Sequence, residues 1–461
     1  MQRWGALVVV VFSYAIVRAD EAPPATITQF IETVARGDSR LYKIDSRADP
    51  NARAALPIGV FDSGIGGLTV LEALLTVDLF DNVTHQPRAD GRPDFEQERF
   101  IYLADQANMP YGNYCSAGNE AFLRELILRD ALFLLGSRYW HSTMVDRTNG
   151  CKPPVKAIVV ACNTATAYGL DDIRRAVDRW NVAMPVVGVV EAGAAGVVER
   201  LPTSDEPDGV AILATVGTCA SGAYPRTVSR MAGERGRRIG TIVQHGSQHL
   251  AAVIEGDPSA TMSVDDCIRD DVAALVERYR QSGATRPIAT VVLGCTHFPL
   301  EKDRIAAAFA RLRDLTDADG KQPYRDLISP ELVLVNPAQQ TARQLYVELV
   351  RSRRLSTSAA AGIDEHRFFI TVPAPRTATL MADDGGFTAE YKVGRQAGRF
   401  DDEDFHAMPM TCERLSSTTR DMLRSRLPAV CAAWKASNLP APNVGDLPMR
   451  RNGFGLFGSP K

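Results

Sequence analysis

The sequence predicts an α/β protein of two pseudo-symmetric domains, whose parallel central sheets face one active-site cleft. Two observations support this prediction. Short apolar runs alternate with longer amphipathic segments through most of the 461 residues, as expected where helices connect parallel strands. In addition, segment 158–164 (Ile-Val-Val-Ala-Cys-Asn-Thr) is echoed by segment 291–297 (Val-Val-Leu-Gly-Cys-Thr-His). A repeated unit of strand and cysteine indicates two halves of related design.

Each predicted strand is a short apolar run, and a helical pattern separates most neighbouring strands. The strands are expected at 58–61, 100–103, 157–160, 185–189, 210–214, 241–243, 289–293, 332–335 and 368–372. Helices are expected between them, among them 68–75, 121–135, 165–179, 272–281 and 340–350. Polar inserts near 81–99, 139–154 and 311–330 are expected to be surface loops.

The two ends of the chain differ in composition from its middle. A basic start, an uncharged apolar run and the small-residue site Val17-Arg18-Ala19 have the layout of a secretory signal peptide. Beyond Val372 we expect a turn at 383–386 within a hairpin, a helix at 416–433 and a disordered end rich in Pro and Gly. The predicted domains are a signal peptide at 1–19, a polar leader with one short helix at 20–56, a first domain at 57–188 plus 301–372, a second domain at 189–300, and a C-terminal extension at 373–461.

Charge and composition exclude some classes of function. The formal net charge is only -3 and no basic tract alternates with aromatic residues, which argues against nucleic-acid binding. No stretch after the signal is long and apolar enough to span a membrane, so no membrane partner is expected once the signal is removed. We therefore predict an exported, periplasmic protein. The alternative is an uncleaved anchor or a wrongly assigned start, the latter giving a cytoplasmic protein.

A glycine-rich segment, Asp62-Ser63-Gly64-Ile65-Gly66-Gly67, follows the first predicted strand and opens a helix. Glycines allow backbone N–H groups to approach a ligand closely, and a helix N-terminus favours an anion. The segment lacks the spacing of dinucleotide-binding and phosphate-binding loops. It could equally be a tight turn in which Asp62 or Ser63 caps the helix.

Cys162 and Cys295 each follow a predicted buried strand, at the end where open parallel sheets bind ligands. A single cysteine in such a place is more often a small buried hydrophobe than a catalyst. Two cysteines in matched settings, each beside hydroxyl or amide side chains, favour chemistry instead, since polar neighbours can lower a thiol pKa. His297 could assist that chemistry or be a buried structural imidazole.

These motifs together resemble the glutamate racemases of the aspartate/glutamate racemase family. The resemblance spans residues 57–372. Its segments are 59–68 (Gly-Val-Phe-Asp-Ser-Gly-Ile-Gly-Gly-Leu), 161–167 (Ala-Cys-Asn-Thr-Ala-Thr-Ala), 293–300 (Leu-Gly-Cys-Thr-His-Phe-Pro-Leu), Asp105 with 109–112 (Met-Pro-Tyr-Gly), 187–193, and 214–215 with 221–224. His297, two positions after the second cysteine, resembles the glutamate enzymes, whereas aspartate racemases usually have Glu there.

The resemblance implies a cofactor-independent, metal-free racemisation of L- and D-glutamate, which supplies D-glutamate for peptidoglycan in bacteria. Cys162 and Cys295 would be acid/base catalysts on opposite faces of the substrate, assisted by Asp62 and His297. Substrate would be bound by Asp62, Ser63, Tyr111, Gly112, Asn163, Thr164, Thr296 and His297. The sequence is compatible with a homodimer but does not require one.

Three alternatives remain at this point. A racemase of the same fold could act on aspartate, a hydantoin or another amino acid, because segment 245–249 (His-Gly-Ser-Gln-His), ahead of Glu255-Gly256, replaces a stretch that is rich in Pro in the family. A periplasmic protein could bind an amino acid without catalysis, although a binder needs neither thiol. A third possibility is a bifunctional or inhibitory protein whose extension binds a partner.

Six further cysteines lie outside the motifs, and export would permit disulfides. From proximity along the chain we expect Cys412–Cys431 first, then Cys115–Cys151 and Cys219–Cys267. The alternative is that all eight cysteines are reduced, as expected in a cytoplasmic protein. Cys162 and Cys295 should remain thiols, because a bridge between them would remove both bases.

Overall fold

The computed structural model describes residues 24–39, 41–42, 44, 53–142, 148, 150–202, 207–256, 260–356, 366–381 and 386–437. The predicted signal peptide, residues 383–385 of the turn predicted at 383–386, and the end beyond residue 437 lie outside these residues. Within the described ranges, no helix is both long and apolar enough to cross a membrane.

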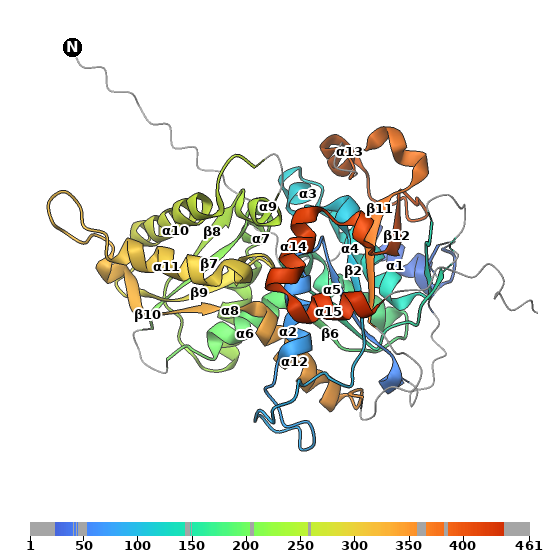
Figure 1. Ribbon diagram of the computed structural model, residues 1–461, viewed down its shortest axis with the longest axis horizontal. Helices are drawn as coiled ribbons and strands as arrows, with labels where there is room; N and C mark the ends of the chain where they lie inside the picture. The colour runs from blue at the N-terminus through green and yellow to red at the C-terminus, as the bar shows by residue number, and fades with distance from the viewer. Residues whose placement is uncertain are drawn as a thin grey trace, which may run out of the picture.

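The first domain is built on a six-stranded sheet with the order β12-β11-β2-β1-β5-β6 (Figure 1). Neighbouring strands are parallel except β11 and β12, which are antiparallel. Strands β1 and β2 are buried along their whole length, as expected for a parallel sheet with helices on both faces. The strands are β1 (Ile58–Asp62), β2 (Phe100–Ala104), β5 (Ala157–Val160), β6 (Val186–Gly188), β11 (Arg367–Pro373) and β12 (Phe405–Pro409).

The second domain is built on a four-stranded parallel sheet with the order β10-β9-β7-β8. Its strands lie in the chain between β6 and β11, so it is inserted into the first domain. Its strands are β7 (Gly209–Thr215), β8 (Ile242–Ser247), β9 (Ile288–Gly294) and β10 (Ile328–Val335).

The two sheets are topologically equivalent. The order β2-β1-β5-β6 in the first corresponds to β8-β7-β9-β10 in the second. The equivalence pairs β5 with β9, the strands before the two cysteines, and β1 with β7. The predicted α/β class with parallel sheets in two related halves is therefore confirmed.

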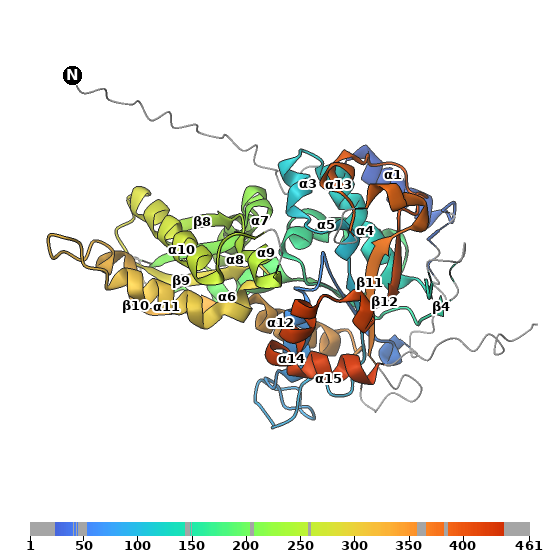
Figure 2. The same ribbon diagram turned by 45° about the horizontal axis from the view of Figure 1, so that its top comes forward.

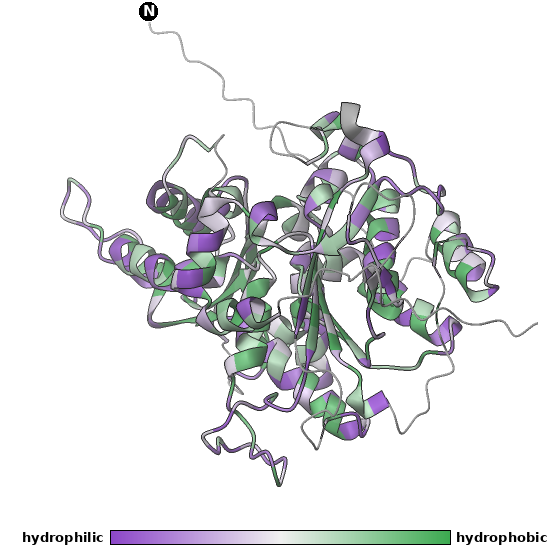
Figure 3. Cartoon of the chain, turned by 45° about the vertical axis from the view of Figure 1, so that its right-hand side comes forward, coloured by the Kyte–Doolittle hydropathy of each residue, from purple (hydrophilic) through white to green (hydrophobic). Residues whose placement is uncertain are grey.

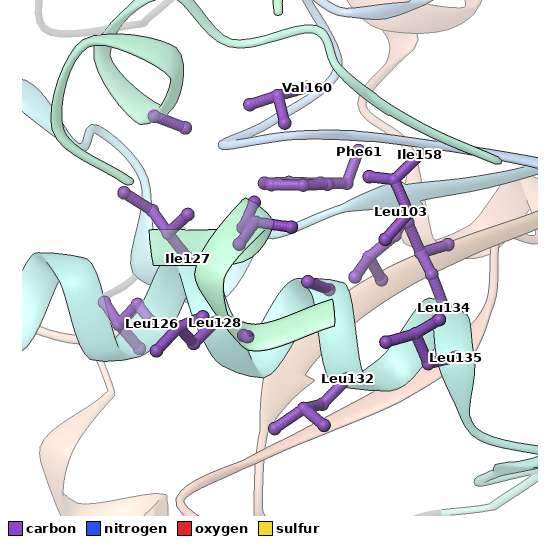
Figure 4. Close-up of a cluster of buried hydrophobic side chains, with 14 of the residues drawn as sticks. Phe61, Leu103, Leu126, Ile127, Leu128, Leu132, Leu134, Leu135, Ile158 and Val160 are labelled. Atoms are coloured by element: carbon purple, nitrogen blue, oxygen red, sulfur yellow. The ribbon is translucent and has the colours of Figure 1, made fainter. Parts of the chain in front are cut away.

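Helices bury apolar faces on both sides of each sheet. In the first domain, Leu126, Leu128 and Leu134 of α4 (Glu120–Leu135) lie in one cluster with Phe61 and Ile158 from the sheet (Figure 4). Full burial of each such side chain contributes about 1.5–3 kcal/mol. The same cluster includes residues of α1 (Ala25–Ala35) and α5 (Asn163–Arg179), whereas the opposite face is covered by α2 (Leu68–Thr76), α12 (Pro337–Arg351), α14 (Ser417–Arg426) and α15 (Pro428–Ala436).

The second domain has the same layered design. Figure 3 shows its green, apolar strands beneath helices with many hydrophilic residues. The helices on one face are α10 (Val264–Gln281) and α11 (Lys302–Arg313), and on the other α6 (Val189–Val198) and α8 (Ala223–Glu234).

Several predicted boundaries differ from the structure. Strand β10 pairs with β9, so the chain returns to the first domain only at α12 and β11 and not at residue 301. The leader is not merely polar, because Ile27, Phe30 and Ile31 of α1 are buried in the first domain. The extension is likewise integral, since β12 completes the first sheet.

The single helix expected at 416–433 is wrong. Two helices, α14 and α15, meet at Leu427, where φ is -132° and ψ 63°. Pro428 causes the break, since its ring disfavours helical geometry in the preceding residue while suiting the first turn of a new helix. The prediction also missed β12 and the short ribbon of β3 (Arg138–Tyr139) and β4 (Gly150–Cys151).

The predicted disulfides are absent, because all eight cysteines are free thiols. Cys431 is buried in the apolar cluster beneath α15, whereas Cys412 is exposed. Proximity along the chain was therefore a poor guide to pairing.

Candidate active site

Asp62 ends β1, and the glycine-rich loop folds back over its carboxylate. Asp62 Oδ2 accepts the N–H groups of Gly64 (3.2 Å) and Gly67 (2.9 Å). Asp62 Oδ1 is buried without a hydrogen-bond partner among the described residues. Burial raises the pKa of Asp62 to about 6, opposed by the charge of His297 and by the two N–H groups. At neutral pH this carboxylate is mostly ionised and has one oxygen free to accept a cation.

Cys162 follows β5 and caps the N-terminus of α5. Its Sγ accepts the N–H of Ala165 at 3.4 Å, and its thiol donates to Ser63 Oγ at 3.6 Å. Burial and the nearby carboxylate of Asp62 raise the pKa of this thiol. Cys162 is therefore a protonated thiol in the closed, substrate-free site.

Cys295 follows β9 and has a cationic rather than an anionic neighbour. Its Sγ lies 3.7 Å from Nδ1 of His297, whose Nε2 lies 2.7 Å from Glu255 Oε1. Burial disfavours the charged imidazole, but the Glu255 carboxylate and the bond to Cys295 outweigh it and raise the pKa of His297 well above its usual range. His297 is therefore an imidazolium that can stabilise a thiolate on Cys295.

Glu255 was missed as a site residue in the sequence analysis. It is the last residue of α9 (Leu250–Glu255) and precedes Gly256, which has φ +77°. The Glu255-Gly256 pair matches the family pattern, but nothing local assigns Glu255 a role, because its partner His297 lies 42 residues further along the chain. Only the fold brings the pair together.

The glycine-rich loop connects the two cysteine sites. Ser63 contacts Cys162, and Gly66 lies against the second site. A Cβ atom at Gly66 would collide with Cε1 of His297 and lie 2.5 Å from Oγ1 of Thr296. Thr69 Oγ1, at the start of α2, also donates to the carbonyl of Thr296 at 2.8 Å. The two thiols therefore flank one loop, each from a different domain.

Hydroxyl and amide groups of both domains meet beside this loop. Tyr224 OH donates to Asn163 Oδ1 at 2.7 Å, and the hydroxyls of Thr164 and Thr218 are 3.2 Å apart. The backbones of the two domains also lie close together at Gly112 and Gly217, since a Cβ atom added to Gly217 would lie 2.8 Å from Cα of Gly112. The structure thus brings Asp62, Ser63, Gly112, Asn163, Thr164, Thr296 and His297 to one interdomain site around the two cysteines.

The side chain of Tyr111 is engaged by two buried carboxyl groups, which leaves its backbone for the predicted contact with substrate. Its hydroxyl lies 2.6 Å from both Asp105 Oδ2 and Asp130 Oδ2, and the residue is only 1% exposed. A single phenolic proton cannot serve both carboxylates, and burial raises the pKa of Asp130 well above its usual range, so Asp130 carries a proton of its own. The contribution of Tyr111 to the site is the backbone that this network anchors.

The comparisons with known proteins agree with this geometry. The family profile described as Asp/Glu/Hydantoin racemase matches residues 142–319, which include both cysteines. A glutamate racemase of Symbiobacterium thermophilum is 31% identical over 320 residues, which are 68% of this chain and 85% of the relative. A glutamate racemase of Thermus thermophilus is 32% identical over 272 residues, which are 59% of this chain and 77% of the relative.

The chain belongs to the glutamate racemase family. It is therefore an amino-acid racemase by descent, with the two-domain α/β fold described above. A solved glutamate racemase structure from Bacillus anthracis is 23% identical and covers 74% of this chain and 95% of its own, with a TM-score of 0.46.

Proposed function

We propose that this racemase interconverts L- and D-glutamate by moving a proton between two thiols, Cys162 and Cys295. The main support is the placement of each cysteine after equivalent strands, β5 and β9, of the two related sheets. The names of the relatives support glutamate as the substrate.

The electrostatic difference between the thiols gives the reaction its starting point. A thiolate on Cys295, paired with the imidazolium of His297, removes the α-proton and becomes a thiol. The electron pair of the broken C–H bond moves into the substrate carboxylate as an enolate. The thiol of Cys162 then donates its proton to the opposite face of Cα and becomes a thiolate. The opposite enantiomer reacts by the same steps in reverse.

Substrate binding uses polar groups from both domains. The free Oδ1 of Asp62 suits the substrate ammonium group, because this buried oxygen has no other hydrogen-bond partner among the described residues and an unpaired buried acceptor is unfavourable. The hydroxyls of Ser63, Thr164 and Thr296 and the amide of Asn163 are donors for the two carboxylates. Donors aimed at the α-carboxylate would stabilise the charge that develops there when the proton leaves.

Substrate reaches these groups only if the domains or their loops move apart. Cys162 and Cys295 are each 6% exposed and Asp62 only 2%. A closed site excludes water from the thiolate and the enolate, which strengthens the electrostatic interactions around them.

The deciding experiment is an assay of the purified protein on L- and D-glutamate by chiral chromatography, with aspartate in parallel. Glutamate should be turned over at least about tenfold better than aspartate, a difference of about 1.4 kcal/mol in transition-state binding. Better turnover of aspartate would overturn the substrate but not the mechanism. Binding of glutamate without any racemisation would favour the amino-acid-binding alternative.

Two further parts of the proposal need their own tests. Activity should survive dialysis against a chelator, since proton transfer between thiols needs no cofactor; loss of activity that pyridoxal phosphate or a metal restores would contradict this. Export is proposed from residues 1–19, and N-terminal sequencing of the native protein should find the chain beginning near Asp20. A role in supplying D-glutamate for peptidoglycan follows only if the source is a bacterium.

A further inference from the structure

The C-terminal extension packs against the segment around Gly112. Helix α13 (Ala389–Gly394) lies beside α3 (Gly112–Ser116), as both views in Figures 1 and 2 show. The side-chain amide of Asn119 donates to the carbonyls of Val393 (2.9 Å) and Arg395 (2.7 Å). The backbone of the extension is thus fixed where it passes the first domain.

A second anchor lies one step further along the extension. Glu125 and Arg129 of α4 form a buried ion pair that also binds extension backbone. Glu125 Oε2 accepts the N–H of Gly398 at 2.7 Å, and Arg129 donates to the carbonyls of Arg399 and Asp402 at 2.8 Å each. Arg395 therefore sits between two fixed points.

Arg395 is a buried cation that bonds residues on either side of Gly112, namely Asn108 before it and Tyr114 after it. It is 9% exposed, and its Nη2 donates to Asn108 Oδ1 at 2.6 Å and to Tyr114 OH at 3.0 Å. Its Nη1 lies 3.4 Å from Asp404, which supplies the counter-charge. Its guanidinium carbon lies 4.7–5.1 Å from the ring centroids of Phe122, Phe387 and Tyr391. A charge this buried is tolerated because Asp404 pairs with it and the three aromatic rings face its guanidinium group.

The contact with Asn108 fixes the direction of a hydrogen-bond chain. Because Arg395 occupies the amide oxygen of Asn108, the amide nitrogen must face Asp105, to which it donates at 2.7 and 3.0 Å. Asp105 in turn accepts the hydroxyl of Tyr111 at 2.6 Å, and its own N–H donates to the carbonyl of Asp62 at 2.9 Å. This chain of hydrogen bonds ends at Tyr111, the residue before Gly112, and the backbone of Gly112 lies against Gly217 of the second domain.

We propose that Arg395, supplied by the C-terminal extension, is a positioning residue for the racemase site. It orients Asn108 and, through Asp105 and Tyr111, sets the backbone at Gly112 against the second domain. This inference rests on the proposed function, in that the Gly112 backbone belongs to the surface that takes the substrate. The extension is then part of the catalytic unit.

The test compares Arg395→Met with Arg399→Met in the full-length protein. Arg399 is a matched control, because it is an exposed arginine of the same extension whose side chain has, among the described residues, a single ion pair of 4.0 Å with Asp402. In Arg395→Met the KM for glutamate should rise at least about tenfold while kcat changes by less than about threefold. That split is expected when a contact made equally in ground and transition states is lost. Arg399→Met should match the wild type in both constants.

A double-mutant cycle with Asn108→Ala tests the route. If Arg395 acts through Asn108, the KM of the double variant should equal that of the worse single variant. Multiplied effects would contradict this route, and an unchanged KM in folded Arg395→Met would overturn the inference. If Arg395→Met does not fold, Arg395→Lys provides the same test, since an ammonium group cannot reproduce the fork to Asn108, Tyr114 and Asp404.

Amide hydrogen exchange separates this inference from the proposed function. If the wild type racemises no amino acid, the proposed function fails, yet exchange can still be measured. Faster exchange over residues 105–116 in Arg395→Met, with the wild-type rate in Arg399→Met, supports the positioning role. Unchanged exchange there overturns it, whatever the activity.

Discussion

Two side chains of the same type, Cys162 and Cys295, have opposite electrostatic neighbours. Asp62 lies near the first, and the protonated His297 lies near the second. One unit of thiol pKa corresponds to about 1.36 kcal/mol of difference between the charged and neutral forms. Burial beside Asp62 therefore keeps Cys162 protonated, whereas the imidazolium of His297 can balance a negative charge that forms near Cys295.

Replacement of either thiol tests this assignment. Cys162→Ser and Cys295→Ser should each lower kcat/KM for glutamate by about 10²–10⁴, the usual contribution of a positioned acid or base. The loss must be equal in both directions, because the two enantiomers have equal free energy. Cys151→Ser, which changes an exposed thiol, should leave activity unchanged. Near-normal racemisation in either site variant would refute the two-thiol mechanism.

The titration of Asp62 predicts the acid side of the pH profile. Its pKa is raised to about 6, and it must be ionised to accept the substrate ammonium group. The plot of log kcat/KM should therefore fall with decreasing pH below about 6. Asp62→Asn should lose most activity at every pH. A wild-type profile that stays flat to pH 4 would contradict this role.

Glu255 controls the alkaline side through His297. It is one of the groups that raise the pKa of His297, so Glu255→Gln should move the alkaline fall in kcat/KM to lower pH. The loss of stability has a defined sign. Because the folded pKa is raised above the unfolded value near 6.5, the stabilisation is complete below that pH and disappears as the pH rises through the folded pKa.

Urea unfolding of Glu255→Gln and wild type at several pH values would measure this difference. The gap in unfolding free energy should be largest at low pH and should narrow on the alkaline side. In a His297→Asn background, Glu255→Gln should produce no such pH dependence. A gap that widens with pH would exclude the proposed pairing.

The elements that present these residues follow local rules that the sequence displays. All nine predicted strands are present, because most of them are buried parallel strands, which are apolar runs. Strand β12 was missed because its sequence, Phe-His-Ala-Met-Pro, lacks such a run and ends in proline, which an edge strand tolerates. The break before Pro428, by contrast, was visible in the sequence.

The loop between β1 and α2 offers a test at this scale. Gly66→Ala should lower kcat/KM at least about tenfold, because its new methyl group collides with His297 and Thr296. Gly233→Ala, inside α8, is the matched control, since nothing lies within 4 Å of its added carbon. That control should keep full activity and gain up to about 1 kcal/mol of stability. Equal activity in the two variants would place Gly66 outside the site.

In the whole molecule, the cysteine site was predictable because short motifs mark it, whereas its support was not. Glu255, Thr69 and Arg395 reach their partners across tens to hundreds of residues, with no spacing that identifies them. The same holds for the extension, whose chain looked peripheral. Its helices α14 and α15 in fact pack with α2 in the apolar cluster on one face of the first sheet. Glu72 of α2 also accepts the N–H groups of Ala429 (3.1 Å) and Val430 (2.8 Å) at the start of α15.

Truncation of the chain after residue 410 tests whether the extension is part of the first domain. It removes four fully enclosed apolar side chains, Leu415, Leu423, Leu427 and Val430. At about 1.5–3 kcal/mol each, their loss costs about 6–12 kcal/mol as an upper estimate, comparable with the total stability of a domain. The first domain should therefore fail to fold, and racemisation should disappear.

The second domain should survive that truncation, because its apolar clusters contain no residue from the described part of the extension. Hydrogen exchange should then show protected amides in β7 and β9 but not in β1 and β5. A chain ending at residue 437 is the control and should behave as the wild type in both domains. Leu423→Ala in the full-length protein removes one of these side chains and should lower the free energy of unfolding of the first domain by about 2–5 kcal/mol. Protected amides in β1 and wild-type activity after truncation at residue 410 would show that the first domain folds without the extension.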